Sequence, residues 1–181
     1  MLTAHEQKRA ALNHQVSNLI GAGLSIIPLR GNKTPAIRWK KHQKRPSARF
    51  EYGYESGYVG LICGKVSGNI EVIDFDLKYD LTGRLMRDYA DIVRAHDAEL
   101  ISRLVWQQTT SGGYHAIYRS AKIEGNRKLA MRETIESERK SPTDKKRVLI
   151  ETRGEKGYIA VAPSPKYKII KGSLLDIPVI E

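Results

Sequence analysis

The chain has 181 residues, of which 40% are hydrophobic and 28% charged, a composition that can build a core and excludes a disordered protein. Its apolar stretches are short and interrupted by Gly or Pro, which excludes a transmembrane helix, and a single cysteine, Cys63, excludes an intrachain disulfide and a cysteine-based zinc site. The formal charge of +11 favours a polyanionic partner, usually nucleic acid and sometimes an anionic membrane.

The first predicted element is a helix over residues 4–21. Thr3 and Glu6 have the spacing of a capping box, and apolar residues then recur at helical spacing. The charged residues of this stretch leave no apolar leader for export, so we expect a cytoplasmic protein. Residues 24–29 follow as a short apolar strand.

Residues 30–49 are rich in Lys and Arg and contain no acidic residue, which predicts a basic loop that tracks nucleic acid, with Trp39 as its anchor. We expect nucleic-acid contacts from Lys33, Arg38, Lys40, Lys41, Lys44 and Arg45. Tyr52, Tyr54 and Tyr58 are candidates for stacking on bases, although packing in the core or at a sheet edge is the commoner role of such residues.

The central part of the chain is predicted to alternate between strands and helix. Strands are expected over residues 59–62 and 70–75, the second rich in β-branched residues. Residues 81–104 suit one long helix or two short ones, and residues 105–109 and 114–118 flank a Ser-Gly-Gly turn as a hairpin.

Residues 120–147 are highly charged and weakly patterned, and we expect them to form a mobile insertion that tracks the template backbone together with the basic loop. Three more short strands are predicted over residues 148–151, 158–162 and 167–170. This order of elements predicts an α+β fold with a mostly antiparallel sheet. The sequence indicates no terminal element before Glu181, so a fragment of a longer protein is one interpretation.

Three carboxylates stand at predicted strand ends. Asp74 and Asp76 are two residues apart on one strand, so their side chains share a face, and Glu151 ends another apolar strand. Two carboxylates that close repel each other, and a divalent cation that prefers oxygen ligands, Mg²⁺ or Mn²⁺, would remove that cost. The alternative is that these acids only mark strand ends that meet solvent.

The segment Ser111-Gly112-Gly113-Tyr114-His115 offers backbone N–H groups that approach an anion closely, with a histidine beside them that can donate to a phosphate. Arg153 could face a triphosphate in the same site. The alternative is a hairpin turn in which the glycines only supply positive φ, while Arg153 belongs to an ordinary β-turn.

Taken together, three segments resemble the motifs of the bifunctional primase-polymerase (prim-pol) family of the archaeo-eukaryotic primase superfamily. They are Asp74-Phe75-Asp76, Ser111-Gly112-Gly113-Tyr114-His115, and Glu151-Thr152-Arg153-Gly154 followed by residues 157–164. The N-terminal region is also similar, through Ile27-Pro28-Leu29, Lys33, Pro35, Trp39, Gly60-Leu61-Ile62 and Gly64. The resemblance covers roughly residues 20–170.

The chain also departs from the family pattern. Glu151 stands where many relatives carry Asp, which alters the geometry of metal binding without abolishing it. One cysteine excludes the cysteine-rich zinc module that many superfamily members carry, and the sequence has no P-loop for a helicase. The resemblance therefore implies either a fragment of a longer replication protein or a stand-alone primase with a separate helicase.

The resemblance implies one prim-pol catalytic domain over residues 1–181. It would have an RRM-like, mostly antiparallel catalytic sheet with flanking helices and a smaller N-terminal αβ unit. The N-terminal part with the basic loop would span residues 1–60, and the catalytic core would span residues 61–170, with the charged insertion inside it.

The resemblance further implies a template-directed nucleotidyltransferase, a DNA primase/polymerase of plasmid, phage or mobile-element replication in a prokaryotic cytoplasm. Asp74, Asp76 and Glu151 would hold two divalent ions, Mg²⁺ or Mn²⁺ and not zinc, and would be catalytic together with His115. The nucleotide would be held by Ser111, Gly112, Gly113, His115 and Arg153. The implied partners are an NTP or dNTP, a single-stranded DNA template and a helicase, and no membrane.

Two other function classes stay open at this point. A non-catalytic single-stranded nucleic-acid-binding module of a replication protein explains the charge but leaves the three acids without a purpose. A metal-dependent nuclease could use the same acids but leaves the turn over residues 111–115 unexplained.

Overall fold

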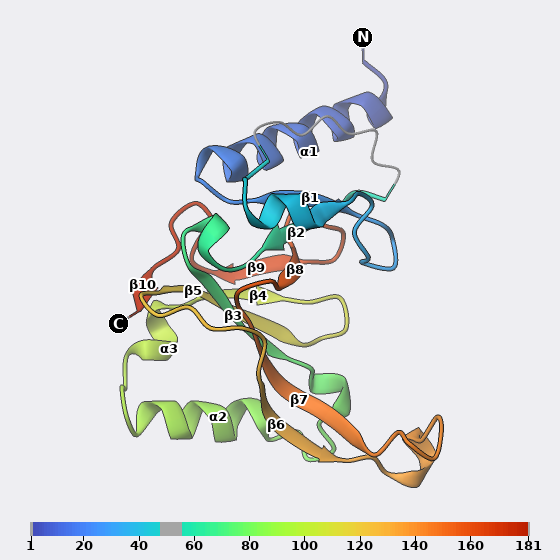
Figure 1. Cartoon of the computed structure of the whole chain (residues 1–181), viewed down its shortest axis with the longest axis vertical. Helices are drawn as coiled ribbons and strands as arrows, with labels where there is room; N and C mark the ends of the chain where they lie inside the picture. The colour runs from blue at the N-terminus through green and yellow to red at the C-terminus, as the bar shows by residue number, and fades with distance from the viewer. Residues whose placement is uncertain (1, 48–55, 181) are drawn as a thin grey trace.

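A computed structural model describes residues 2–47 and 56–180 as two β-sheets and three α-helices (Figure 1). Within these residues the larger sheet has seven strands in the order β6-β7-β3-β5-β4-β9, with β10 paired to β5. Only β5 and β10 are parallel, so the predicted α+β fold with a mostly antiparallel sheet is confirmed. Tyr52 and Tyr54, two of the candidate stacking residues, lie outside the described residues.

The elements follow the predicted order. The strands of the larger sheet are β3 (Ile70–Phe75), β4 (Val105–Gln108), β5 (Tyr114–Ser120), β6 (Lys128–Glu133), β7 (Lys146–Arg153), β9 (Lys168–Lys171) and β10 (Val179–Ile180). The smaller sheet contains β1 (Ile26–Leu29), β2 (Tyr58–Ile62) and β8 (Tyr158–Val161). The α-helices are α1 (Ala4–Gly21), α2 (Leu85–Arg94) and α3 (Leu100–Arg103), and the 3₁₀ helices are η1 (Trp39–Gln43), η2 (Lys65–Ser67), η3 (Leu77–Tyr79) and η4 (Glu136–Glu138).

Helix α1 begins at the predicted capping box. The Thr3 hydroxyl accepts from the Glu6 N–H (3.3 Å), and the Glu6 carboxylate accepts from the Thr3 N–H (2.7 Å), which satisfies donors that a first helical turn leaves unpaired. Val16 and Leu19 are buried in one apolar cluster with Ile26, so α1 covers the smaller sheet (Figure 1). Of the helices in the described residues, none combines the length and apolarity that crossing a bilayer needs.

The smaller sheet is not built from the N-terminal part of the chain alone. Its third strand, β8, follows β7 of the larger sheet after a turn and pairs with β2. The two sheets share a core, because Val59 and Val161 of the smaller sheet belong to the same apolar cluster as Val72 and Ile117 of the larger one. The turn between β7 and β8 therefore lies where the two sheets meet.

Strand β3 lies between β5 and β7 and alternates between two environments. Val72 is fully buried in the core shared with the smaller sheet. Phe75 points to the opposite face, where its ring packs against Tyr89 of α2 (centroids 4.8 Å apart) and Trp106 of β4 (5.8 Å). Asp74 is two residues beyond Val72 on the first face, and its side chain is 25% exposed where that core opens toward solvent.

The expectation of a mobile insertion over residues 120–147 is wrong. The segment contains β6 and η4, and β6 runs antiparallel to β7 with Met131 opposite Val148 (Figure 1). Its alternation is hidden, because Leu129 and Met131 are 53% and 44% exposed and the register shifts along the strand. Strand β6 therefore forms because it pairs with β7, and not because its own sequence alternates between apolar and polar residues. The two-residue strand β10 is likewise too short to carry a period.

Cys63 provides a test of the packing between the sheets. Its side chain is 1% exposed in the core, and burial raises the pKa of the thiol. Because only the thiolate attacks a disulfide reagent, we expect no reaction of the folded protein with dithiobis(nitrobenzoate) at mildly alkaline pH and one equivalent after unfolding in guanidinium chloride. Stoichiometric labelling of the folded protein, followed by absorbance, would contradict this packing.

Candidate active site

Four strands of the larger sheet bring polar residues into one row. Asp74 of β3 is directly opposite Glu151 of β7 on one side and His115 of β5 on the other, and His115 is opposite Gln107 of β4. Residues opposite each other on neighbouring strands project from the same face of a sheet. The structure thus brings together an imidazole and two carboxylates that are far apart in the sequence.

Asp74 is surrounded by positive or hydrogen-bonding groups. Its Oδ1 lies 3.5 Å from Nε2 of His115, and its Oδ2 lies 4.0 Å from Nε of Arg153. Burial alone would raise the pKa of Asp74, but the hydrogen bond and charge of His115 and the charge of Arg153 outweigh it, and the pKa is lowered. Asp74 is therefore a carboxylate at neutral pH.

Glu151 and Asp76 complete the acidic part of the site. Burial raises the pKa of Glu151; the charge of Arg153 opposes this effect, and the negative charge of Asp74 adds to it. Arg153 also donates a hydrogen bond to Glu151 Oε1. Asp76 accepts from the Lys78 ammonium at 3.0 Å. The three acids, Asp74, Asp76 and Glu151, line one cavity of about 190 Å³, the acidic cavity.

The donor chemistry of these acids fits a divalent cation, but their present contacts do not form a metal site. All three supply carboxylate oxygens, the ligands that Mg²⁺ and Mn²⁺ prefer. Across residues 2–47 and 56–180, however, no three His, Cys, Asp or Glu side chains gather closely enough to hold a metal ion. Glu151 is instead bonded to Arg153, and Asp76 to Lys78. Metal binding by the three acids stays a prediction.

A pocket of about 340 Å³, the nucleotide-sized pocket, opens beside the row. Asp74, Asp76 and His115 line it from β3, its end and β5, while Ile159 and Ala160 line it from β8. Its cationic lining residues are Lys33, Lys78, Arg153 and Lys156. These four cations suit a chain of phosphates, because hydrogen bonds between a cationic side chain and a phosphate oxygen are stronger than those between neutral groups.

Lys33 lies apart from the rest of the predicted basic loop. Its Nζ donates to the Thr110 hydroxyl (2.7 Å) and lies 5.6 Å from the centre of the Tyr167 ring, so it belongs to the nucleotide-sized pocket. Trp39 packs edge-on against Tyr158 of β8 (centroids 5.1 Å apart), as its predicted anchoring role requires. The other predicted nucleic-acid contacts are exposed in or beside η1: Arg38, Lys40, Lys41, Lys44 and Arg45.

The glycines between β4 and β5 serve the geometry of the turn. Gly112 has a φ of 82°, and its N–H donates to the Thr109 carbonyl (3.1 Å). A Cβ at Gly113 would lie 2.1 Å from the carbonyl oxygen of Phe75, so glycine is needed for the turn to lie against β3. Ser111 is exposed and lines the nucleotide-sized pocket. Phosphate binding by this turn stays a prediction.

Gln107 determines which nitrogen of the neutral His115 ring carries the proton. The sequence alone did not identify this residue. Its side chain is fully buried, and its Oε1 accepts from the Ala162 N–H (2.7 Å). Its Nε2 donates to the Ala160 carbonyl (3.1 Å) and faces Nδ1 of His115 (3.0 Å). Because Nε2 of Gln107 has only protons to offer, Nδ1 of His115 accepts, and the proton of the neutral ring sits on Nε2, facing Asp74.

Other pocket residues also escaped the sequence analysis. Lys156 lies in the turn between β7 and β8, and Tyr167 follows β8, where burial raises the pKa of its hydroxyl to about 12. The one available signal was the position of Gln107, which shares its strand face with the apolar Val105. Tyr58, a candidate for base stacking, packs edge-on against Tyr167 (centroids 6.5 Å apart), which is the packing alternative.

Comparison with known proteins points to one family. The family model described as "Bifunctional DNA primase/polymerase, N-terminal" (Prim-Pol) matches residues 17–179, which is nearly the whole chain. The match spans every strand of the polar row as well as Lys33 and the turn between β7 and β8. No curated protein matches the chain.

The role of Gln107 predicts a change at Nδ1 of His115 on substitution. In Gln107→Glu a carboxylate oxygen faces Nδ1 in place of an N–H, so Nδ1 exchanges the role of acceptor for that of donor, while Nε2 still faces the Asp74 carboxylate. Nitrogen-15 chemical shifts of the imidazole should report this exchange. Gln108→Glu is the matched control, because the neighbouring side chain points to the other face and should leave the shifts unchanged. Identical shifts in both variants would contradict the assignment.

Proposed function

The chain belongs to the bifunctional DNA primase/polymerase family, and from that premise we propose that it is a template-directed nucleotidyltransferase that joins an NTP or dNTP to a 3′-hydroxyl. The observation that carries the proposal is the position of Asp74 between Glu151 and His115, at the mouth of a cation-lined pocket. Nucleotidyl transfer needs carboxylates that could hold divalent ions at the α-phosphate and cations that bind the other phosphates, and both kinds of group line this site.

The nucleotide-sized pocket holds the triphosphate in this proposal. Ser111, His115 and Arg153 take the roles that the family resemblance implies, and Lys33 and Lys156 add two further cations. His115 presents its Nε2 proton as a donor to a phosphate oxygen, and Gln107 keeps the ring in that tautomer. The backbone of Gly112 and Gly113 shapes the turn that carries Ser111.

Asp74, Asp76 and Glu151 hold two divalent ions, Mg²⁺ or Mn²⁺, in this proposal. Bound there, the ions would polarise the α-phosphate and the attacking 3′-hydroxyl. Arg153 links this group to the pocket, because its guanidinium lines the pocket and also bonds Glu151. A triphosphate therefore competes with Glu151 for Arg153, and nucleotide binding frees the Glu151 carboxylate.

The exposed cations in and beside η1 contact a single-stranded DNA template in this proposal: Arg38, Lys40, Lys41, Lys44 and Arg45. We further propose that the protein acts in plasmid, phage or mobile-element replication. A helicase domain or a separate helicase would unwind the DNA. A nuclease or a non-catalytic binding module has no use for a cation-lined pocket of nucleotide size next to the acids, which favours the transferase.

Substitution of the acids tests the reaction. We expect Asp74→Asn and Asp76→Asn to lower primer extension by about 100-fold or more, because preorganised charge at a transition state is worth that much. Incorporation of labelled nucleotide with Mg²⁺ or Mn²⁺ is the measurement, and circular dichroism checks the fold. Asp91→Asn on α2, whose carboxylate is exposed, is the control and should be fully active. Undiminished synthesis by Asp74→Asn would refute the proposal.

Lys33 and Lys40 should separate nucleotide binding from template binding. Removing a charge-assisted hydrogen bond to a phosphate costs about 1.5–3 kcal/mol, so Lys33→Ala should raise the KM for the nucleotide by about 10-fold or more and leave the template Kd unchanged. Lys40→Ala should raise the Kd for the template and leave the KM for the nucleotide unchanged. Steady-state kinetics and fluorescence anisotropy give the two constants. If Lys33→Ala raises the template Kd and leaves the nucleotide KM unchanged, Lys33 binds the template.

A further inference from the structure

The acidic cavity continues into a second groove that the proposed function does not use. It shares Asp74 and Asp76 with the nucleotide-sized pocket, and it shares Tyr79 and Arg147 with a third cavity of about 550 Å³. Lys78, Arg139 and Lys140 also line that third cavity, which we name the distal groove. The three cavities therefore follow one another through shared lining residues, from the nucleotide-sized pocket past the carboxylates to the loop between β6 and β7.

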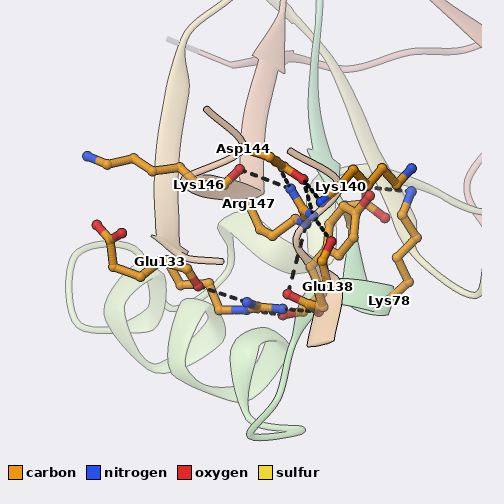
Figure 2. Close-up of polar contacts among 10 residues, drawn as sticks. Lys78, Glu133, Glu138, Lys140, Asp144, Lys146 and Arg147 are labelled. Atoms are coloured by element: carbon orange, nitrogen blue, oxygen red, sulfur yellow. Dashed lines mark hydrogen bonds and ion pairs between the residues drawn. The ribbon is translucent and has the colours of Figure 1, made fainter. Parts of the chain in front are cut away.

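The buried Arg147 lines the distal groove and lies at the centre of a cluster of polar contacts (Figure 2). The Arg147 side chain is 10% exposed; it hydrogen-bonds the Asp144 carboxylate and the Glu138 carbonyl (2.6 Å), and its guanidinium lies 5.4 Å from the centre of the Tyr79 ring. Arg132 bonds the Glu138 carboxylate (2.5 Å). Two of the three acids of this loop, Glu138 and Asp144, are thus held by these arginines. The cations beside them that line the groove are Lys78, Arg139 and Lys140.

The loop between β6 and β7 is held in a defined shape. The backbone N–H of Lys140 donates to the Asp144 carboxylate within the loop (3.0 Å), and Arg147 of β7 donates to Asp144 and to the Glu138 carbonyl. Arg132 of β6 donates to the Tyr79 carbonyl of η3 (2.7 Å). Figure 2 shows the side chains of Lys78 and Lys140 reaching to the same side of this cluster, and both line the distal groove. The groove is a basic surface with a fixed backbone.

The chemistry of phosphoryl transfer decides what approaches from this side. The attacking oxygen and the leaving oxygen lie roughly in line across the phosphorus. The cation-lined pocket that would take the leaving pyrophosphate is lined by β5, by β8 and by Arg153 at the end of β7. The acidic cavity lies along the other half of β7, Lys146–Leu149, and Asp74 and Asp76 line both cavities. With the pyrophosphate on the first side, the attacking 3′-hydroxyl comes from the Lys146–Leu149 side.

We propose that the distal groove binds the phosphodiester backbone of the strand that ends in the 3′-hydroxyl, a primer strand and not the template. Arg147 lies four residues before Glu151 on β7, about 13 Å along the strand. That length corresponds to about four nucleotides of a duplex at 3.4 Å per step. Lys78, Arg139 and Lys140 contact phosphates there. The proposal rests on the transferase function proposed above, because it uses its direction of attack.

Crosslinking tests which strand lies in the groove. The only natural thiol, Cys63, is buried, so Lys140→Cys can be modified selectively with a photoactivatable reagent. Primer–template DNA carrying a label on either strand is then bound without nucleotide or divalent cation and irradiated. We expect the crosslink on the primer strand, within about five nucleotides of its 3′ end. Lys168→Cys on β9, at the opposite edge of the sheet, should yield less than about one tenth as much. Crosslinks confined to the template, or equal yields from both positions, overturn the proposal.

Charge reversal gives an independent measurement on the same DNA. Arg139→Glu with Lys140→Glu should weaken primer–template binding by about 10-fold and make the salt slope shallower by about 2, the value for two lost phosphate contacts. Affinity for unprimed single strands should be unchanged, and Lys168→Glu with Lys171→Glu is the control of equal charge. Equal losses on primed and unprimed DNA overturn the proposal.

Primer binding in the distal groove and the transferase function are tested separately, because neither measurement requires catalysis. A primer crosslink in a protein that cannot extend primers supports the groove and contradicts the transferase function. Primer extension by a protein whose Lys140→Cys variant gives no primer crosslink supports the transferase function and overturns the groove.

Discussion

Strand β3 exchanges backbone hydrogen bonds with β5 on one side and β7 on the other, and the site depends on the register of both pairings. A slip of one residue in either ladder would turn His115 or Glu151 to the opposite face of the sheet. Apolar side chains hold that register, because Val72 is buried against the smaller sheet while Phe75 and Ile150 are buried against the helices. The core therefore positions the polar row.

The polar row is asymmetric in charge, although its two carboxylates are opposite each other. Asp74 has His115 and Arg153 beside it, and its pKa is lowered despite burial. Burial raises the pKa of Glu151, and the nearby negative charge of Asp74 adds to that rise. Arg153 contacts both acids and also lines the nucleotide-sized pocket. A ligand in that pocket that bonds Arg153 would therefore change the contacts of the Glu151 carboxylate.

The two sheets place different chemistry on the two sides of β3. The smaller sheet contributes β8 and positions Trp39 and Lys33, which close the cationic pocket. The pairing of β6 with β7 extends the larger sheet in the other direction, and the Arg147 cluster shapes a basic groove at its end. The carboxylates lie between a place suited to a triphosphate and a place suited to a strand of nucleic acid.

The sequence alone determined the elements that carry a local period or a cap, among them α1, β3 and the β4–β5 hairpin. It also identified Asp74 and Glu151 at strand ends and His115 beside the Ser-Gly-Gly turn. Only the tertiary structure decided which strands are neighbours, and therefore that these side chains form one row. Strand β6 and the contact of Gln107 with His115 were also decided there. The physical reason is that a periodic pattern reports which face of a strand is buried, whereas pairing partners and buried hydrogen bonds are chosen by residues far away in the chain.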